Sequence, residues 1–434
     1  MQTVLSYVDA AGRGKLDSAL VTLYGSQALS MQRQRCISLL HRMEKWIGNA
    51  KAVLVSAPGR TELGGNHTDH NNGVVLAAAV DFDCLAVASP CGTNVIHVQS
   101  EGVSGVIEVD LDDLSPRKEE VGTPAALIRG VADGFVQAGY VMKGFDACIS
   151  GNVPMGSGLS SSAAFEVGIG QIFNQLFNEG SVPPVELARI GRRAENLHFG
   201  KPCGFMDQIA CAVQGVLSID FLDVEAPVVT EVDVDFEASG YQLAVVDTGG
   251  DHADLTPEYA AIPEEMTRAA QVLGQDFARG LTMEQVLASA SEIRQQVGGR
   301  ALLRLMHFIE ESERAKLQAD ILRQGDFQKY LELVNASGDS SWKLLQNCIS
   351  TVHSDEQPIT VALALTERFL QGVGAWRIQG GGFAGTIQAY VPIDRFADYK
   401  AYMETVFGFG AVLPLSIRKP GNELILPQGV GEEG

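Results

Sequence analysis

Several common sequence signatures are missing from this chain of 434 residues. Its seven cysteines are scattered and include no Cys-x-x-Cys pair, so we read them as reduced, mostly buried thiols. The first residues show no cationic segment followed by an apolar one, and no apolar run is long enough to span a bilayer. The chain is therefore predicted to be cytoplasmic and to have no membrane partner.

Basic residues are scarce as well. Lys and Arg number 32 against 53 Asp and Glu, which gives a formal net charge of −21 at pH 7. This balance disfavours wrapping nucleic acid or lying on an anionic membrane, because both carry negative charge. Small molecules are the predicted partners, and an anionic one would need local basic groups.

The glycine-rich turn at Pro154–Ala164 lacks the Gly-Lys-Ser/Thr ending of a Walker A loop and the glycine spacing of a dinucleotide fingerprint. It does contain Gly156 and Gly158, which can adopt positive φ, and a serine cluster at 160–162. The residues that follow, 163–173, have the apolar spacing of a helix, whose start would stabilise an anion. These residues alone leave two readings open, a phosphate-binding loop and an ordinary glycine turn with a serine N-cap.

Length and a hydrophobic content of 46% predict two domains with a sizeable core. Apolar spacing predicts a helical extension over residues 1–50 and then a first domain over 51–238 that mixes strands and helices. Ser239 and Gly240 resemble a hinge before a second mixed domain over 239–434. The predicted fold class is α+β.

A polar loop is predicted at Pro58–Gly73, between two apolar strands. Loops dense in His, Asp and Asn suit the recognition of several hydroxyl groups at once. A metal site at His67, Asp69 and His70 is disfavoured, because no further His or Cys cluster completes a ligand set.

Two later stretches complete the candidate site, Glu195–Gln208 and Gln379–Thr386. Asp207 lies among apolar residues, where desolvation would raise its pKa unless a cation such as Arg60 keeps it ionised. A carboxylate so placed is a candidate general base. Taken singly, a residue such as Asp207 is more often an ordinary helix-cap or ion-pair residue, and a run such as Gly380–Gly385 is more often an ordinary tight turn.

Together the four stretches, in this order, resemble the galactokinase branch of the GHMP small-molecule kinases over about residues 35–420. The fold implied by the resemblance is a two-domain α+β structure with the active site in the cleft between the domains. The implied activity is transfer of the γ-phosphoryl group of ATP to the anomeric hydroxyl of galactose, with Mg²⁺.

The resemblance also implies roles for individual residues. Asp207 would be the base, and Arg60 would orient it and stabilise charge on the transferring group. Sugar-binding positions would be Asn66, His67, Asp69, Gly204 and Tyr259. The ATP phosphates would lie against Gly156, Ser157, Gly158, Leu159, Ser160, Ser161 and Ser162, and Mg²⁺ would be held by Ser162 and Glu195.

The chain departs from the family at Asn66, where galactokinases have a glutamate aimed at the outer hydroxyls of the sugar, and at the neighbouring His70. We expect this change to remove a negative charge from the part of the site that faces the outer hydroxyls of the sugar, near C6. The substrate is then either galactose or a relative with an anionic C6 group, such as galacturonate. A second departure is Trp376–Gln379, which replaces a more apolar stretch. A third possibility is a regulator that binds sugar and ATP without turnover, which Arg60, Asp207 and the complete serine run argue against.

Overall fold

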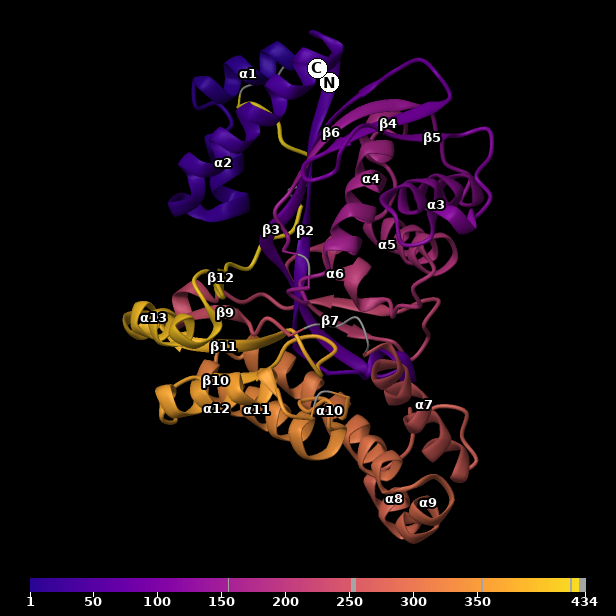
Figure 1. Cartoon of the computed structure of the whole chain (residues 1–434), viewed down its shortest axis with the longest axis vertical. Helices are drawn as coiled ribbons and strands as arrows, with labels where there is room; N and C mark the ends of the chain where they lie inside the picture. The colour runs from indigo at the N-terminus through magenta and orange to yellow at the C-terminus, as the bar shows by residue number, and fades with distance from the viewer. Residues whose placement is uncertain (155, 251–254, 353, 422–423, 429–434) are drawn as a thin grey trace.

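The computed structural model describes residues 1–434 except 155, 251–254, 353, 422–423 and 429–434. The molecule is elongated, and the last described residue, Gln428, lies against the N-terminal helices, with its backbone N–H donating to the carbonyl of Lys15 at 2.9 Å (Figure 1). The strands are β1 (Gln2–Thr3), β2 (Lys51–Gly64), β3 (Val74–Pro90), β4 (Val95–Ser100), β5 (Ile107–Asp110), β6 (Phe145–Gly151), β7 (Val216–Asp220), β8 (Val228–Glu231), β9 (Tyr241–Asp247), β10 (Ala375–Ile378), β11 (Thr386–Pro392) and β12 (Val412–Leu415). The helices are α1 (Val4–Gly12), α2 (Asp17–Ile47), α3 (Pro124–Gln137), α4 (Ser161–Phe177), α5 (Pro184–Ala194), α6 (Met206–Val213), α7 (Thr256–Val272), α8 (Met283–Ala288), α9 (Ala290–Val297), α10 (Gly299–Arg323), α11 (Phe327–Ser340), α12 (Pro358–Leu370) and α13 (Phe396–Phe407).

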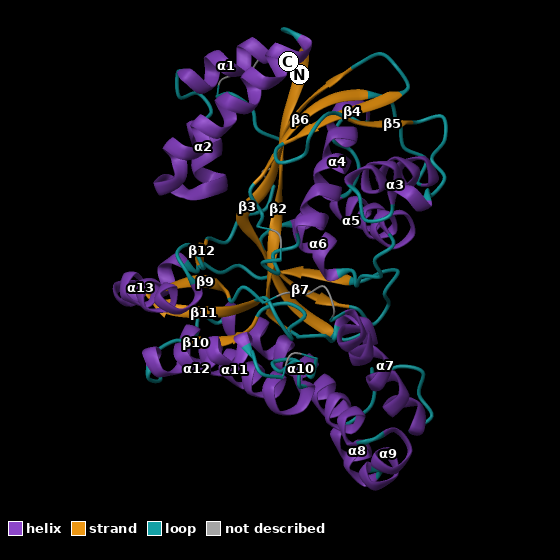
Figure 2. Cartoon of the chain, in the orientation of Figure 1, coloured by secondary structure: helices purple, strands orange, loops and turns teal. Residues whose placement is uncertain are grey.

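Within the described residues, the first sheet has eight strands, and the long strand β3 organises it. The first half of β3 pairs with β7, its second half pairs with β6, and β2 runs antiparallel along its other edge. The parallel pairing of β4 with β6 extends the sheet toward β5. The loop between β2 and β3 lies beside α7, in the lower half of the view (Figure 2).

Both faces of the first sheet are buried. Along β2, Val53, Val55 and Ala57 pack into the core formed with α3, α4, α5 and α6. The alternate residues Ala52 and Leu54 pack against α1 and α2 on the opposite face. Successive side chains of a strand point to opposite faces, so the part of a strand that is covered on both sides is a nearly continuous apolar run, as residues 52–55 of β2 are.

The second sheet is antiparallel, and its described strands run in the order β10-β11-β9-β12. Helices α12 and α13 cover one face with Ile359, Leu363 and Met403, while α10 and α11 pack on the other side against residues of both sheets. The α+β class predicted from the sequence is confirmed. The second sheet begins at Tyr241, whereas the predicted domain boundary near residue 239 remains a prediction.

The C-terminal segment returns to the first sheet. Leu424 forms a bridge with Val55, and the backbone N–H of Ile425 donates to the carbonyl of Leu54 at 2.8 Å. Arg418 lies fully buried beside Asp83 of β3, with its Nη1 3.9 Å from that carboxylate. Asp83 therefore joins the tail of the chain to the centre of the first sheet.

Three elements of the structure differ from what the sequence predicts. The predicted polar loop at Pro58–Gly73 is strand as far as Gly64, because Arg60 and Glu62 pair with β3 and are buried despite their charge. The apolar spacing of residues 281–297 predicts one helix, whereas the structure has two, α8 and α9, which meet at Ser289. Helix α13 was not predicted.

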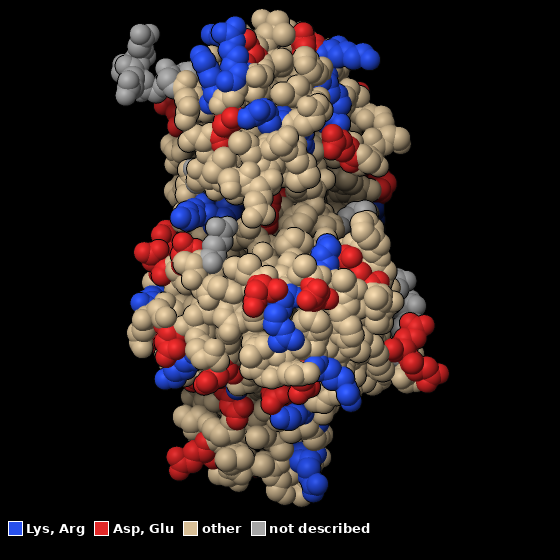
Figure 3. Space-filling view, turned by 90° about the vertical axis from the view of Figure 1, so that its left-hand side faces the viewer, with Lys and Arg blue, Asp and Glu red and all other residues tan. Residues whose placement is uncertain are grey.

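The surface and the cysteines agree with the composition. On the face shown in Figure 3, Lys and Arg side chains are interspersed with Asp and Glu, and no continuous basic area forms there. All seven cysteines are free thiols, and five of them are buried. No helix in the described part of the chain has the length and apolar character needed to cross a membrane.

Candidate active site

A cavity of about 680 Å³ lies between the first sheet and the helices and glycine loop that follow it in the chain. It brings together every residue that the sequence predicted for catalysis or sugar binding. Those residues are Arg60, Asn66, His67, Asp69, Gly204, Asp207 and Tyr259. The predicted Gly380 and Gly381 of the third glycine motif also line it, so the cavity joins three of the four stretches.

The candidate base Asp207 stands at the start of α6 and is held from two sides. The Arg60 Nε donates to Asp207 Oδ1 at 2.8 Å, and Arg60 Nη2 lies 2.7 Å from the same oxygen. The hydroxyl of Ser160 donates to Asp207 Oδ2. Arg60 itself is anchored to the serine loop, since its Nη1 donates to the carbonyl of Gly158. Asp207, Arg60 and the serine loop are thus joined by hydrogen bonds.

Electrostatics keep this carboxylate ionised. Burial alone would raise the pKa of Asp207, but the charge of Arg60 and the hydrogen bonds from Ser160 and Arg60 outweigh burial and lower it. The side chain remains 29% exposed toward the cavity. An ionised, partly open carboxylate can accept a proton from a hydroxyl placed in the cavity.

The sugar-side residues are fixed by close backbone contacts. A Cβ on Gly204 would stand 1.9 Å from Asp69 Oδ2, so only glycine leaves room for this carboxylate. Tyr259 donates its hydroxyl to the carbonyl of Gly382 at 2.7 Å. His67 Nε2 donates to the carbonyl of Gly381 at 2.9 Å. Burial lowers the pKa of His67 to about 3, so its imidazole is neutral at physiological pH.

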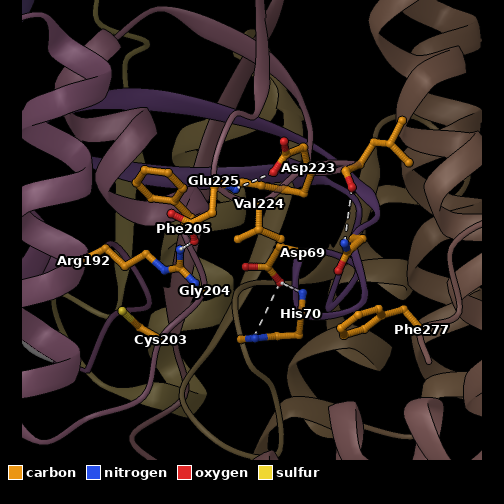
Figure 4. Close-up of a pocket in the computed structure, with 13 residues that line it drawn as sticks. Asp69, His70, Arg192, Cys203, Gly204, Phe205, Asp223, Val224, Glu225 and Phe277 are labelled. Atoms are coloured by element: carbon orange, nitrogen blue, oxygen red, sulfur yellow. Dashed lines mark hydrogen bonds and ion pairs between the residues drawn. The ribbon is translucent and has the colours of Figure 1, made fainter.

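A second cavity of about 470 Å³ adjoins the first and shares Asp69, His70, Cys203 and Gly204 with it. Figure 4 shows the Asp69 carboxylate turned toward His70, with Arg192 and Phe205 on the opposite wall. The backbone N–H of His70 donates to Asp69 Oδ1 at 3.0 Å, and both residues line both cavities.

The serine loop precedes α4, as predicted, and meets the third glycine motif. Ser160 has φ of +59°, a left-handed conformation that is uncommon outside glycine and costs of order 1 kcal/mol. This conformation accompanies the hydrogen bond from Ser160 to Asp207. Gln379 Nε2 donates to the carbonyl of Gly158 at 3.2 Å, and Thr386 Oγ1 donates to the carbonyl of Ser157 at 3.0 Å.

Of the residues predicted for ATP, several use their side chains within the protein. Ser157 Oγ donates to the carbonyl of Pro154 at 2.6 Å, and the Leu159 side chain is fully buried. Gly156 and Gly158 have φ of +77° and +69°, and Ser161 begins α4. What this loop offers to phosphate is therefore mainly backbone N–H groups and the start of a helix of 17 residues.

The predicted metal ligands lie side by side. Ser162 Oγ donates to Glu195 Oε1 at 2.9 Å, and Lys201 Nζ lies 3.2 Å from the same oxygen. Glu195 is 2% exposed. The nearby Glu166 has a buried Oε1 without a hydrogen-bond partner in the described structure. Hydroxyl and carboxylate oxygens are the donors that Mg²⁺ prefers, so this group of side chains fits the ion.

The structure corrects one expectation about Asn66. Its amide Nδ2 donates to Glu62 Oε1 at 3.0 Å and to the carbonyl of Gly380 at 2.8 Å. Its Oδ1 accepts from Asn347 Nδ2 at 2.9 Å and from Ser341 Oγ at 3.3 Å. The corner is therefore not free of negative charge, because a carboxylate lies within hydrogen-bonding distance of the asparagine.

Sequence reasoning missed three residues of this site, although each had a signal. Glu62 follows Arg60 by two positions, the spacing that puts two strand residues on one face. Glu166 follows Ser162 by four, the spacing that puts two helix residues on one face. Lys201 lies six positions after Glu195 within the base-bearing stretch, and no periodicity places it near that carboxylate.

Two family models match the chain, the GHMP kinases N terminal domain over residues 126–215 and the galactokinase galactose-binding signature over residues 44–90. A galactokinase of Glaesserella parasuis serovar 5 is 30% identical over 356 residues, which are 82% of this chain and 89% of that protein. A galactokinase of Actinobacillus pleuropneumoniae is also 30% identical, over 80% of this chain and 87% of that protein.

One solved structure, a galactokinase of Lactococcus lactis complexed with galactose, matches with a TM-score of 0.75 at 24% sequence identity. The match covers 88% of this chain and 97% of that chain. It confirms the two-domain fold that the sequence predicted.

Proposed function

The chain belongs to the galactokinase family of the GHMP kinases, and on this premise we propose that it transfers the γ-phosphoryl group of ATP to the anomeric hydroxyl of galactose. The observation that carries the proposal is the Arg60–Asp207 pair in the cavity, at 2.7 Å, bonded to the serine loop on one side and facing the sugar-binding residues on the other. A proton acceptor and a phosphate loop so joined suit phosphoryl transfer to a hydroxyl.

In the proposed reaction, Asp207 accepts the proton of the anomeric hydroxyl as the sugar oxygen forms its bond to the γ-phosphorus. The bond from that phosphorus to the bridging oxygen breaks, and ADP leaves. Arg60 keeps Asp207 ionised before the transfer and places positive charge beside the transferring group. Such positioning and electrostatic stabilisation supply most of the rate enhancement in phosphoryl transfer.

We propose that the phosphates of ATP are held by the backbone from Gly156 to Ser162 and by the first turn of α4. Ser162 and Glu195 would hold Mg²⁺, which neutralises charge on the phosphates when it is bound. His67, Asp69 and Tyr259 are proposed to contact the sugar. The proposed sugar contacts rest on the positions of these residues around the cavity. The proposed ATP and Mg²⁺ contacts rest on the hydrogen bonds from Ser160 to Asp207 and from Ser162 to Glu195.

The experiment that tests the function is an ADP-release assay with galactose, galacturonate, N-acetylgalactosamine, arabinose and glucose. We expect ATP- and Mg²⁺-dependent turnover with galactose. Turnover on none of these sugars, together with intact sugar-dependent ATP binding, would identify a regulator instead. Turnover on galacturonate in preference to galactose would keep the kinase chemistry and change the substrate.

A further inference from the structure

Glu62 lies on the same face of β2 as Arg60. Between them the pairing with β3 is regular, since Arg60 lies opposite Ala79 and Glu62 opposite Ala77. Residues two positions apart on a strand point the same way, and their Cα atoms are about 7 Å apart. Both side chains line the cavity. A hexose held with its anomeric hydroxyl at Asp207 therefore has Glu62 along its length.

The Glu62 carboxylate is bound by the protein through one oxygen only. Its Oε1 accepts from Asn66 Nδ2 at 3.0 Å and from Arg377 Nη2 at 2.5 Å. No described residue donates a hydrogen bond to its Oε2, although Glu62 is only 3% exposed. Because Glu62 lines the cavity and its Oε2 is not enclosed by the protein, a ligand hydroxyl in the cavity can donate a hydrogen bond to this oxygen.

The two departures from the family pattern meet at this carboxylate. Asn66 and Arg377 are 311 positions apart in the chain, and both bond to Glu62 Oε1. Arg377 is fully buried on β10, so its charge is matched by Glu62 rather than by solvent. All four hydrogen-bonding positions of the Asn66 amide are occupied within the protein, so Asn66 fixes Glu62 and does not replace it.

We propose that Glu62 is the specificity-determining carboxylate of the sugar site, with its Oε2 accepting a hydrogen bond from a sugar hydroxyl. The inference rests on the proposed kinase function and narrows its substrate to neutral sugars of the galactose type. A uronate would bring a second carboxylate against Glu62, which like-charge repulsion opposes. Arg377 and Asn66 are positioning residues for Glu62.

Four variants test the proposal: Glu62→Gln, Glu62→Asn, Asn66→Glu, and the exchange Glu62→Asn with Asn66→Glu. Each is measured for kcat and KM by ADP release and for binding of galactose and of galacturonate by calorimetry. Glu62→Gln should raise the galactose KM and dissociation constant about 10- to 100-fold, the loss of a hydrogen bond to a charged group. It should also shift the binding ratio toward galacturonate by at least about 10-fold.

The exchange variant shows whether weak galactose binding by the single variants comes from lost specificity or from a disturbed fold. Asn66→Glu alone sets two carboxylates against each other, and Glu62→Asn alone leaves Arg377 buried without its partner, so both should bind galactose poorly. The exchange keeps one carboxylate in the corner, and we expect it to recover galactose binding to within a few-fold of the wild type.

The matched control is Glu311→Gln. Glu311 is also buried and accepts from the backbone N–H of Gly65 at 3.1 Å, but it does not line the cavity. It should alter stability and leave the ratio of galactose to galacturonate binding unchanged.

An unchanged ratio in Glu62→Gln, or an exchange variant no better than the single variants, would overturn the inference. Wild-type protein without galactose turnover would overturn the proposed function, while the binding ratios would still decide the role of Glu62.

Discussion

Asp83 and Asp207 are both carboxylates paired with arginine, and they differ in what surrounds them. Asp83 is fully buried and is contacted by Tyr24 Oη at 2.6 Å and by Arg35 Nη1 at 2.7 Å. Asp207 keeps 29% of its side chain exposed, and the exposed part faces a cavity. A carboxylate enclosed by the chain on all sides can only stabilise the fold, whereas one open to a cavity can exchange a proton with a ligand.

Asp83 and Asp207 also join different parts of the chain. Asp83 connects helix α2, through Arg35, with the C-terminal segment, through Arg418. Asp207 connects β2, through Arg60, with the serine loop, through Ser160. The first set ties the two ends of the chain to the sheet, and the second assembles the proposed reaction centre. We therefore expect substitutions at Asp83 to lower the stability of the fold, and substitutions at Asp207 to lower the rate of turnover.

The largest effect is expected from Asp207→Asn, which removes the proposed proton acceptor and keeps the size of the side chain. We expect kcat to fall by at least about 10²-fold, the lower end of general-base effects, with a smaller loss of thermal stability than at Asp83. ADP release under saturating substrates and a thermal unfolding curve measure both quantities. Turnover near the wild-type value would remove Asp207 as the base.

Asp83→Asn should show the opposite pattern. Removing one partner of a buried ion pair leaves Arg35 without its carboxylate, which costs about 3–5 kcal/mol of unfolding free energy. Because Asp83 does not line the cavity, kcat per folded molecule should be unchanged. Urea unfolding and active-site titration test this. A loss of kcat in the folded fraction would contradict the separation of the two sites.

The Arg60→Met variant isolates what the arginine does for Asp207. In the wild type the pKa of Asp207 is lowered below its ordinary value, so the base stays ionised until pH falls through that lowered pKa. Without Arg60, burial is left to raise that pKa, and the acid limb of kcat/KM should move up by about 1–3 pH units. The pH profiles of both proteins are compared. An acid limb that does not move would show that Ser160 alone holds Asp207 ionised.

The fold and the site also show which features the sequence could predict and which it could not. The four motifs and the α+β class could be read from local patterns, because each motif is contiguous in the chain. The grouping of the site residues around one cavity was implied by the family that the four motifs together resemble. The partners of Glu62 could not, since Asn66 follows it by four positions while Arg377 lies 315 positions away. A buried pair across two sheets depends on tertiary packing, which no local periodicity records. The strand through Arg60 and Glu62 was missed for the same reason, because charged residues do not indicate a buried strand until their partners are known.

The smallest effect is expected at Lys201, whose ammonium group lies 3.2 Å from Glu195 Oε1 and is 62% exposed. It is an exposed cation beside a proposed Mg²⁺ ligand, in contrast to the buried Arg418 beside Asp83. Lys201→Gln removes a competitor for that oxygen, and an exposed ion pair contributes about 1 kcal/mol or less. We therefore expect the Mg²⁺ concentration for half-maximal activity to fall by no more than about five-fold.

The matched control is Lys343→Gln, which removes an equally exposed lysine, paired with Asp339 at 3.1 Å, and does not line the cavity. Activity titrated with Mg²⁺ at a fixed saturating ATP concentration compares the two variants with the wild type. A fall in the half-maximal concentration for Lys201→Gln alone would identify the lysine and the metal as rivals for Glu195. If instead more Mg²⁺ is needed and kcat falls, the ammonium group serves the phosphates together with the ion, and Lys201 belongs with Arg60 among the cations of the reaction centre.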